Sequence, residues 1–147
     1  MENFKKTSKQ IIVMRKSFII NGKKVTPRKG KYIAQGSHAS LKAILDLMST
    51  RPALNPGKPI IKELVMYPTS ALYDWINGTF TKICVCVETE EELLEVYNKA
   101  KDKGLICSLI TDAGNTEFDG VPTITCCAIG PAWSYELEDI TKHLQLF

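Results

Sequence analysis

A short basic segment, Arg28-Lys29-Gly30-Lys31, stands where the sequence predicts the start of a helix. Each lysine there costs about 0.3–1 kcal/mol, because a helix N-terminus already carries partial positive charge. Cations and free backbone N–H groups that meet at one helix end can bind a phosphate or another oxyanion. The segment therefore predicts anion binding, with Arg28 and Lys29 as candidate phosphate ligands, and a solubilising basic surface is the alternative.

Three polar residues follow along this helix. Lys31, Gln35 and His38 are spaced i, i+4 and i+7, so they project from one face. The small residues beside them, Ala34 and Ser37, leave room for a bound molecule. An ordinary solvated glutamine and a core histidine beside the apolar stripe are the alternative interpretations.

A second candidate group is the segment Asp112-Ala-Gly-Asn-Thr116. Asp112 follows an apolar strand, and ligands of α/β sheets gather at the carboxyl ends of strands. Gly114 permits a tight turn that would hold the carboxylate in place. The alternative is an aspartate that only closes the strand. Thr125 lies in the next strand, where simple alternation places its hydroxyl on the face of Cys127, opposite Cys126.

The elements that must position these residues can be traced along the chain. We expect strands near residues 10–14, 82–87, 105–110 and 123–129, and a hairpin around Asn21-Gly22. Helices are expected at residues 31–48, around Trp75, from Thr89 to Lys103, and after Ser134 as a cap. The stripe that should bury the first helix consists of Ala34, Leu41, Leu45 and Met48, supplemented by Ile33 and Ile44. Residues 49–68 contain four prolines and predict a mostly irregular excursion.

This order predicts an α/β fold: a single-domain three-layer α/β sandwich with a mixed, roughly four-stranded sheet and a β-hairpin insertion after the first strand. Within the 147 residues we expect a basic N-terminal tail, residues 1–10, and one domain, residues 11–147. No run of about 18 apolar residues is present, which excludes a membrane helix. No signal-peptide pattern is visible, and a cytoplasmic protein is expected.

Charge and cysteine content narrow the function further. Residues 1–31 carry ten Lys/Arg and one acid, whereas residues 32–147 carry nine Lys/Arg and fifteen acids. Such a split suggests that the basic end faces a polyanion. The five cysteines lie in apolar runs without a Cys-x-x-Cys pair, so we expect reduced core thiols. No metal-ligand cluster and no cofactor site is expected.

Three segments together resemble the type 2 peptidyl-tRNA hydrolase family. They are the helix start from Lys29 to Ala39, with Lys-Gly-Lys, Ala-Gln and His-Ala; the Asp112-Ala-Gly-Asn-Thr116 segment; and the last strand from Thr123 to Pro131. The C-terminal Thr141-Lys-His-Leu144 is also similar. The segments occur in family order and span nearly the whole chain from Ile11.

The resemblance implies that Lys31, Asp112 and Thr125 form the catalytic group. It implies that peptidyl-tRNA is the substrate, that Gln35, His38 and Thr116 line its site, and that the protein is a homodimer. Water would attack the ester without a covalent intermediate. Lys31 would stabilise the oxyanion or hold the terminal phosphate nearby, Asp112 would orient or deprotonate the water, and Thr125 would hydrogen-bond water or the ribose. Two departures from the family are the hairpin at Asn21-Gly22 and Arg28 in place of a glycine.

Two rival functions deserve comparison. A non-catalytic RNA-binding or partner-binding domain of the same fold would explain the basic segment, but it has no need for Lys31, Asp112 and Thr125 together. A thiol enzyme using Cys126 or Cys127 is disfavoured, because both lie in an apolar strand with no basic neighbour in sequence.

Overall fold

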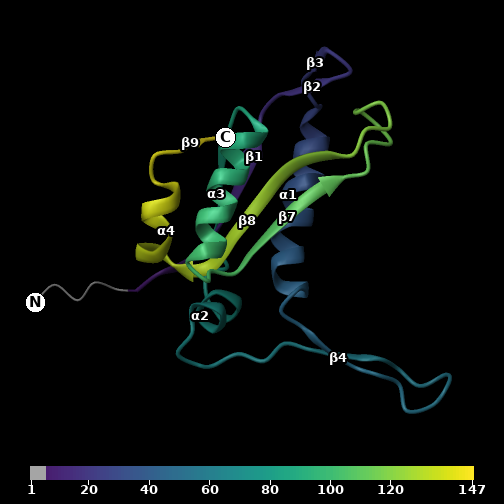
Figure 1. The fold of residues 1–147 in the computed structure, drawn as a ribbon. Helices are drawn as coiled ribbons and strands as arrows, with labels where there is room; N and C mark the ends of the chain where they lie inside the picture. Colours follow the sequence, from purple (N-terminus) through teal and green to yellow (C-terminus); the bar gives the residue numbers. More distant parts are fainter. Residues whose placement is uncertain (1–5) are drawn as a thin grey trace, which may run out of the picture.

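Five strands form the central sheet of residues 6–147, the part of the chain that this computed structural model describes (Figure 1). The sheet order is β7-β8-β1-β6-β9, with bounds Cys107–Asp112, Thr123–Trp133, Ser8–Arg15, Lys82–Val87 and Gln145–Leu146. β1 and β6 are parallel, and the other neighbours are antiparallel, so the predicted mixed sheet is confirmed. The fifth strand, β9, has only two residues and was too short to predict. Of the predicted tail, residues 1–5 lie outside the described part, and β1 begins at Ser8.

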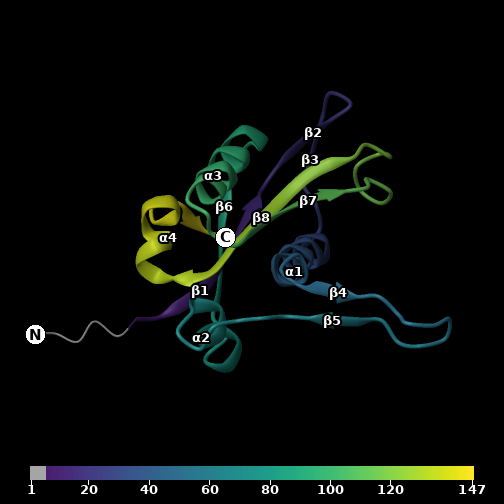
Figure 2. The ribbon, with the colours of Figure 1, turned by 60° about the horizontal axis from the view of Figure 1, so that its bottom comes forward.

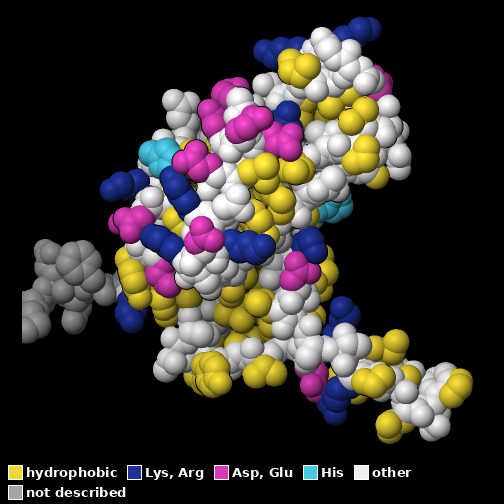
Figure 3. Space-filling model, viewed as in Figure 1, with side chains coloured by type: hydrophobic (Ala, Val, Ile, Leu, Met, Phe, Trp, Pro, Cys, Tyr) yellow, Lys and Arg dark blue, Asp and Glu magenta, His cyan; other side chains and the backbone are white. Residues whose placement is uncertain are grey.

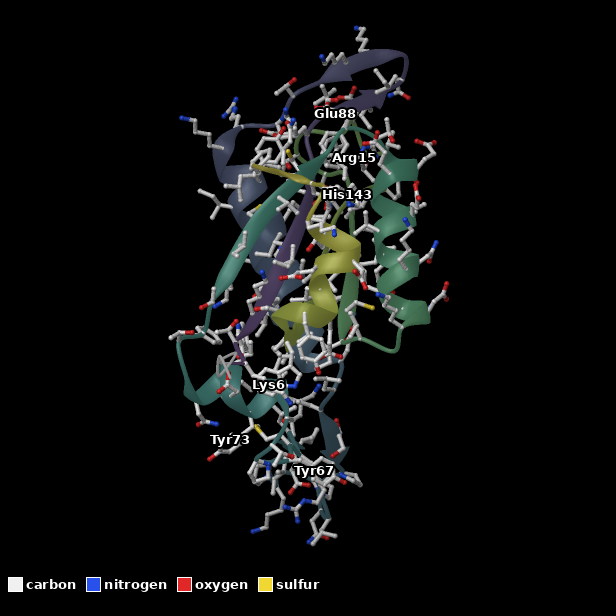
Figure 4. The ribbon with its side chains drawn as sticks, turned by 90° about the vertical axis from the view of Figure 1, so that its left-hand side faces the viewer. Lys6, Arg15, Tyr67, Tyr73, Glu88 and His143 are labelled. Atoms are coloured by element: carbon white, nitrogen blue, oxygen red, sulfur yellow. The ribbon has the colours of Figure 1, made fainter. Side chains whose placement is uncertain are left out.

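Helices cover both faces of the sheet, which confirms the three-layer arrangement (Figures 1 and 4). α1 (Lys29–Leu45) lies on one face, and α3 (Glu90–Asp102) and α4 (Ser134–Thr141) lie side by side on the other. The short α2 (Ala71–Asn77) packs at one end, against β8 and β1. The larger core lies between the sheet and the α3–α4 layer, and a smaller one lies under α1. None of the helices in residues 6–147 is long and apolar enough to cross a membrane.

The buried face of α1 differs from the predicted one. Its buried residues are Gln35, Gly36, Ala39 and Ala43, whereas the predicted core residues Ala34, Leu41 and Leu45, together with Ile33, are exposed. Small side chains let the helix axis approach the sheet closely. The close packing of this face stabilises the helix on the sheet more than packing of the bulkier apolar stripe would. The consequence for the site is direct, because the close face is the one that carries Gln35.

The predicted hairpin is present as β2 (Phe18–Ile20) and β3 (Lys23–Val25). Asn21 and Gly22 both have positive φ, 50° and 77°, as a two-residue turn that matches the strand twist requires. The hairpin root is buried against the segment after β7, since Phe18 and Ile20 form a cluster with Phe118.

The excursion at residues 49–68 is mostly irregular, as predicted, and it contains a short two-stranded ribbon, β4 (Ser49–Arg51) and β5 (Ile61–Glu63), which projects as an arm (Figure 2). Two other local predictions needed correction. β8 does not end near residue 129, as predicted, but continues through Gly130-Pro131 to Trp133 along β1. Ser134 does not cap α4; the helix begins at this residue, and its hydroxyl bonds to Thr7. The predicted capping box of Thr89 and Glu92 on α3 is confirmed.

Candidate active site

Lys31 and Asp112 form an ion pair, with the lysine Nζ 2.9 Å from the Asp112 Oδ2. Lys31 lies in the first turn of α1, and Asp112 is the last residue of β7. Their side chains are 13% and 15% exposed, so the pair is shielded on most sides but open to solvent. The two predicted segments therefore meet at one point, where a small reactant could reach both charges.

The Asp112 carboxylate accepts two further hydrogen bonds. The Gln35 Nε2 donates to Oδ1 at 3.0 Å, and the Gly114 N–H donates to Oδ2 at 2.8 Å. Gly114 has φ +85°, and a Cβ there would lie 2.2 Å from the Val121 carbonyl oxygen, so only glycine fits this turn. Burial raises the pKa of Asp112, but the bonds from Lys31, Gly114 and Gln35 and the Lys31 charge outweigh it and hold the pKa below its usual value.

Gln35 links Asp112 to Thr125. The Thr125 hydroxyl donates to the Gln35 Oε1 at 2.6 Å, and the Cys126 thiol donates to the Gln35 backbone carbonyl at 3.2 Å. The predicted alternation is therefore wrong: Thr125 and Cys126 both face α1. The register between β7 and β8 shifts here, since Ile110 pairs with Cys126 and Thr111 with Ile124, which leaves Thr125 as an extra residue. Such a bulge turns a side chain toward a neighbouring element.

Thr116 and His38 occupy different positions around this cluster. The Thr116 Oγ1 accepts a hydrogen bond from the Lys31 Nζ at 3.0 Å, so Thr116 belongs to the cluster. His38 is exposed, which rules out the core-histidine interpretation. It makes no side-chain hydrogen bond within residues 6–147, and it lies two helical turns from Lys31 on the same side of α1.

The start of α1 is exposed and basic, as the sequence predicted. Arg28 is the N-cap residue with its side chain 93% exposed, and Lys29 is exposed beside it. The first turn contains no acidic residue and no side-chain cap. Glu117 accepts from the Arg28 backbone N–H at 3.3 Å and lies 3.7 Å from its guanidinium. A carboxylate from the loop that follows β7 thus lies at this helix end, where an anion was expected.

Sequence reasoning missed two residues of the site, Phe118 and Glu117. Phe118 is fully buried, and the Lys31 Nζ lies 5.1 Å from its ring centroid, so the ring makes a cation–π contact with the ammonium group. Both residues follow the Asp112 turn within six positions. A large apolar residue inside an otherwise polar loop was the available signal for Phe118.

Cys126 borders this cluster, because its thiol bonds to the Gln35 backbone carbonyl, but burial keeps the thiol protonated. Burial raises the pKa of Cys126 to about 12 and that of Cys84 to about 11. It also raises the pKa of Cys127 well above the ordinary value of a thiol. A thiol with a raised pKa is a poor nucleophile near neutral pH, which disfavours the thiol-enzyme rival. Within residues 6–147, no group of three His, Cys, Asp or Glu side chains could hold a metal ion.

An apolar groove of about 700 Å³ lies on another side of α1. Its lining includes Ile33 and Leu41 of α1, Trp75 of α2, and Ile12 and Cys84 of the sheet. The ion pair does not border it. The reactive side chains and the apolar groove are therefore separate surfaces of the same helix.

Comparison with known proteins adds to this geometry. The family model described as peptidyl-tRNA hydrolase PTH2 matches residues 8–147. The chain is 37% identical over 118 residues to a peptidyl-tRNA hydrolase of Methanocaldococcus jannaschii, covering 80% of this chain and 87% of that protein. It is 35% identical over 140 residues to a peptidyl-tRNA hydrolase of Nanoarchaeum equitans, covering 95% and 98%. The corresponding enzyme of Sulfolobus acidocaldarius is 38% identical over 118 residues, covering 80% and 88%.

Proposed function

We infer the reaction from one premise: the chain belongs to the peptidyl-tRNA hydrolase PTH2 family. We propose that it hydrolyses the ester between a peptide and the 3′ ribose of tRNA, by direct attack of water at the Lys31–Asp112 pair. The observation that carries this assignment is that pair itself, part-exposed and joined by hydrogen bonds to Gln35 and Thr125.

Lys31 is the group that would stabilise the oxyanion formed when water attacks the ester. Its ammonium has three N–H donors, and within residues 6–147 two are used, by Asp112 and Thr116. The third remains for the substrate oxygen, either the developing oxyanion or a nearby phosphate. A fixed, partly desolvated cation serves this role well, because it needs no reorganisation as charge develops.

Asp112 would hold the attacking water. Its Oδ2 accepts from both Lys31 and Gly114, while its Oδ1 accepts only from Gln35 and keeps one acceptor position free. A carboxylate whose pKa lies below the usual range is a weak proton acceptor near neutral pH. We therefore propose that Asp112 mainly orients the water and balances the Lys31 charge, rather than removing a full proton in advance.

Thr125 and Gln35 would act as positioning residues. Thr125 is 1% exposed, and its hydroxyl lies behind Gln35, so contact with water or ribose, as first expected, does not fit. Because Thr125 donates to the Gln35 oxygen, the Gln35 amide must present its NH₂ group to Asp112. The buried chain of bonds thus sets the orientation of the carboxylate.

The direct test is incubation of the purified protein with an N-acetylated aminoacyl-tRNA. Release of free tRNA, followed on an acid gel, would support the assignment, with the Asp112→Asn protein as the matched control. Tight binding of the intact substrate with no release above that control would contradict it and favour the non-catalytic RNA-binding alternative.

We expect the α1 start to contact phosphates of the tRNA. Replacing Arg28 and Lys29 together with Ala should raise KM several-fold and leave kcat nearly unchanged, because both side chains are exposed and neither contacts Asp112. The log–log slope of binding against salt should flatten by about 0.7–0.9 for each lost contact. Filter binding between 50 and 300 mM salt measures this slope. An unchanged slope would place the phosphate contacts elsewhere.

We also propose that two copies associate and that the enzyme works in the cytosol, where its substrate is made. Supporting the dimer, Ile33 and Leu41 of α1 are exposed beside the apolar groove. The variant Leu41→Glu should shift sedimentation toward monomer at micromolar concentration, because a buried carboxylate is costly. A parent protein that sediments as a monomer at the same concentration would contradict the dimer.

A further inference from the structure

Residues 15–31, which contain the β2–β3 hairpin and the start of α1, carry seven Lys/Arg and no acid. Four of the seven are paired: Arg15 with Glu90, Lys16 with Glu88, Arg28 with Glu117, and Lys31 with Asp112. Within residues 6–147, Lys23, Lys24 and Lys29 have no acidic partner. The unbalanced charge of this region is therefore concentrated at the hairpin tip and the helix start.

The hairpin is joined to the Lys31–Asp112 pair by direct packing through Phe118. The Phe118 ring contacts Phe18 of the hairpin, with 4.8 Å between the ring centroids, and it also lies 5.1 Å from the Lys31 Nζ. Arg15, below the hairpin in Figure 4, lies 4.4 Å from the Phe18 ring and pairs with Glu90. The hairpin is thus anchored at its root beside the reacting groups.

The register of the hairpin separates its two lysines. Ile20 pairs with Lys23 and Phe18 with Val25, so these four side chains share the face that packs on Phe118. Lys24 pairs with Ile19, and this pair lies on the opposite face, where Ile19 is exposed. Lys23 therefore lies on the face of the hairpin that is directed toward the loop after β7, the loop that contains Phe118, and Lys24 lies on the other face.

Charge on the neighbouring surface limits where a polyanion could lie. Acidic side chains gather over the start of α3, at Glu88, Glu90, Glu91 and Glu92 (Figure 3). Lys and Arg side chains project from the hairpin at the top of the same view. An RNA backbone would be repelled from the α3 side and drawn to the hairpin and the α1 start.

We infer that the β2–β3 hairpin is a second tRNA contact, in which Lys23 binds a backbone phosphate on the 5′ side of the reacting 3′ end. β2 rises about 3.3 Å per residue from Phe18, which packs on Phe118, to Ile20, the register partner of Lys23, so Lys23 lies about 7 Å further along the hairpin than the contact with Phe118. This inference rests on the proposed function for the identity of the RNA. Lys29 and Lys23 then bind two different phosphates of the same RNA strand.

The test compares Lys23→Ala with Lys24→Ala, a matched pair that removes the same charge from opposite faces of one ribbon. For Lys23→Ala we expect a salt slope shallower by about 0.7–0.9, a KM raised several-fold and an unchanged kcat on N-acetylated aminoacyl-tRNA. For Lys24→Ala we expect a markedly smaller change in both slope and KM. Thermal melting should be the same for both, since neither side chain makes an ion pair with residues 6–147.

Equal effects of the two variants would overturn the face assignment and reduce the hairpin to a general electrostatic attraction. No effect of either would remove the hairpin from the tRNA contact. Both outcomes presuppose that the parent protein releases tRNA in the same assay. If the parent shows no hydrolysis, the proposed function fails, whereas hydrolysis that is insensitive to Lys23→Ala contradicts only the hairpin contact.

Discussion

Replacing Asp112 with Asn should lower kcat by about 10²–10³-fold, the usual cost of removing one fixed electrostatic group, because the amide lacks the negative charge that orients the attacking water and balances the Lys31 charge. Affinity for tRNA should hold or rise, because a carboxylate near a phosphodiester repels it. Single-turnover cleavage and filter binding on the same preparation measure the two effects. A folded Asp112→Asn protein with near-normal turnover would remove Asp112 from the mechanism.

The network allows this variant to fold. An Asn amide oxygen can still accept from Lys31 and Gly114, and its NH₂ group then faces Gln35. The Gln35 amide can turn over, and the Thr125 hydroxyl can accept instead of donate. The charge is lost while the number of hydrogen bonds is kept. The melting temperature of the variant should therefore stay close to that of the parent protein, although kcat falls strongly.

The depressed pKa of Asp112 also predicts a pH dependence. The group is ionised in the folded enzyme at all pH values above its ordinary value of 3.8, so kcat should show no acid limb from Asp112 between pH 5 and 7. The ion pair stabilises the fold above that ordinary value, and this contribution is lost as pH falls through the lower, folded-state pKa. An acid limb near pH 6 that disappears in Asp112→Asn would show that Asp112 is instead a general base with a raised pKa.

Replacing Lys31 with Ala should lower kcat by about 10²–10³-fold, corresponding to the loss of one oxyanion donor at about 2.7–4 kcal/mol. Unlike Asp112→Asn, it should also weaken tRNA binding, because the unpaired Asp112 carboxylate then faces the substrate alone. Steady-state kcat and KM together with tRNA binding separate the two variants. A change confined to KM would assign Lys31 to phosphate binding only.

Two controls make the Lys31 result specific. Lys42→Ala removes an exposed lysine from the last turn of the same helix, where it pairs with Asp46, and kcat should be unaffected. The double variant Lys31→Ala with Asp112→Asn should lose no more activity than the worse single variant, because the two residues act as one unit. Multiplicative losses would mean that the ion pair has no joint role.

Much of the site could be predicted because its signals are local. The spacing of Lys31 and Gln35 places them on one face of any helix, and Asp112 followed by Gly114 predicts a turn at a strand end. Asn21-Gly22 and the Thr89–Glu92 capping box also depend only on residues close in sequence, and both are confirmed. Such features are stabilised by short-range hydrogen bonds and by backbone preferences that each residue carries with it.

What only the tertiary structure decided depends on partners distant in sequence. The buried face of α1 is chosen by how closely Gly36, Ala39 and Ala43 let the helix approach the sheet, not by its apolar stripe. The bulge that turns Thr125 toward Gln35 is a one-residue shift in the pairing of β8 with β7, next to Cys126, where the pairing of β8 with β1 ends, so it depends on strands that are distant in sequence. Phe118 is held beside Lys31 by its packing against Phe18 and Ile20 of the hairpin. Composition and spacing along the chain determined which groups could react, and packing and register between elements decided which of them meet.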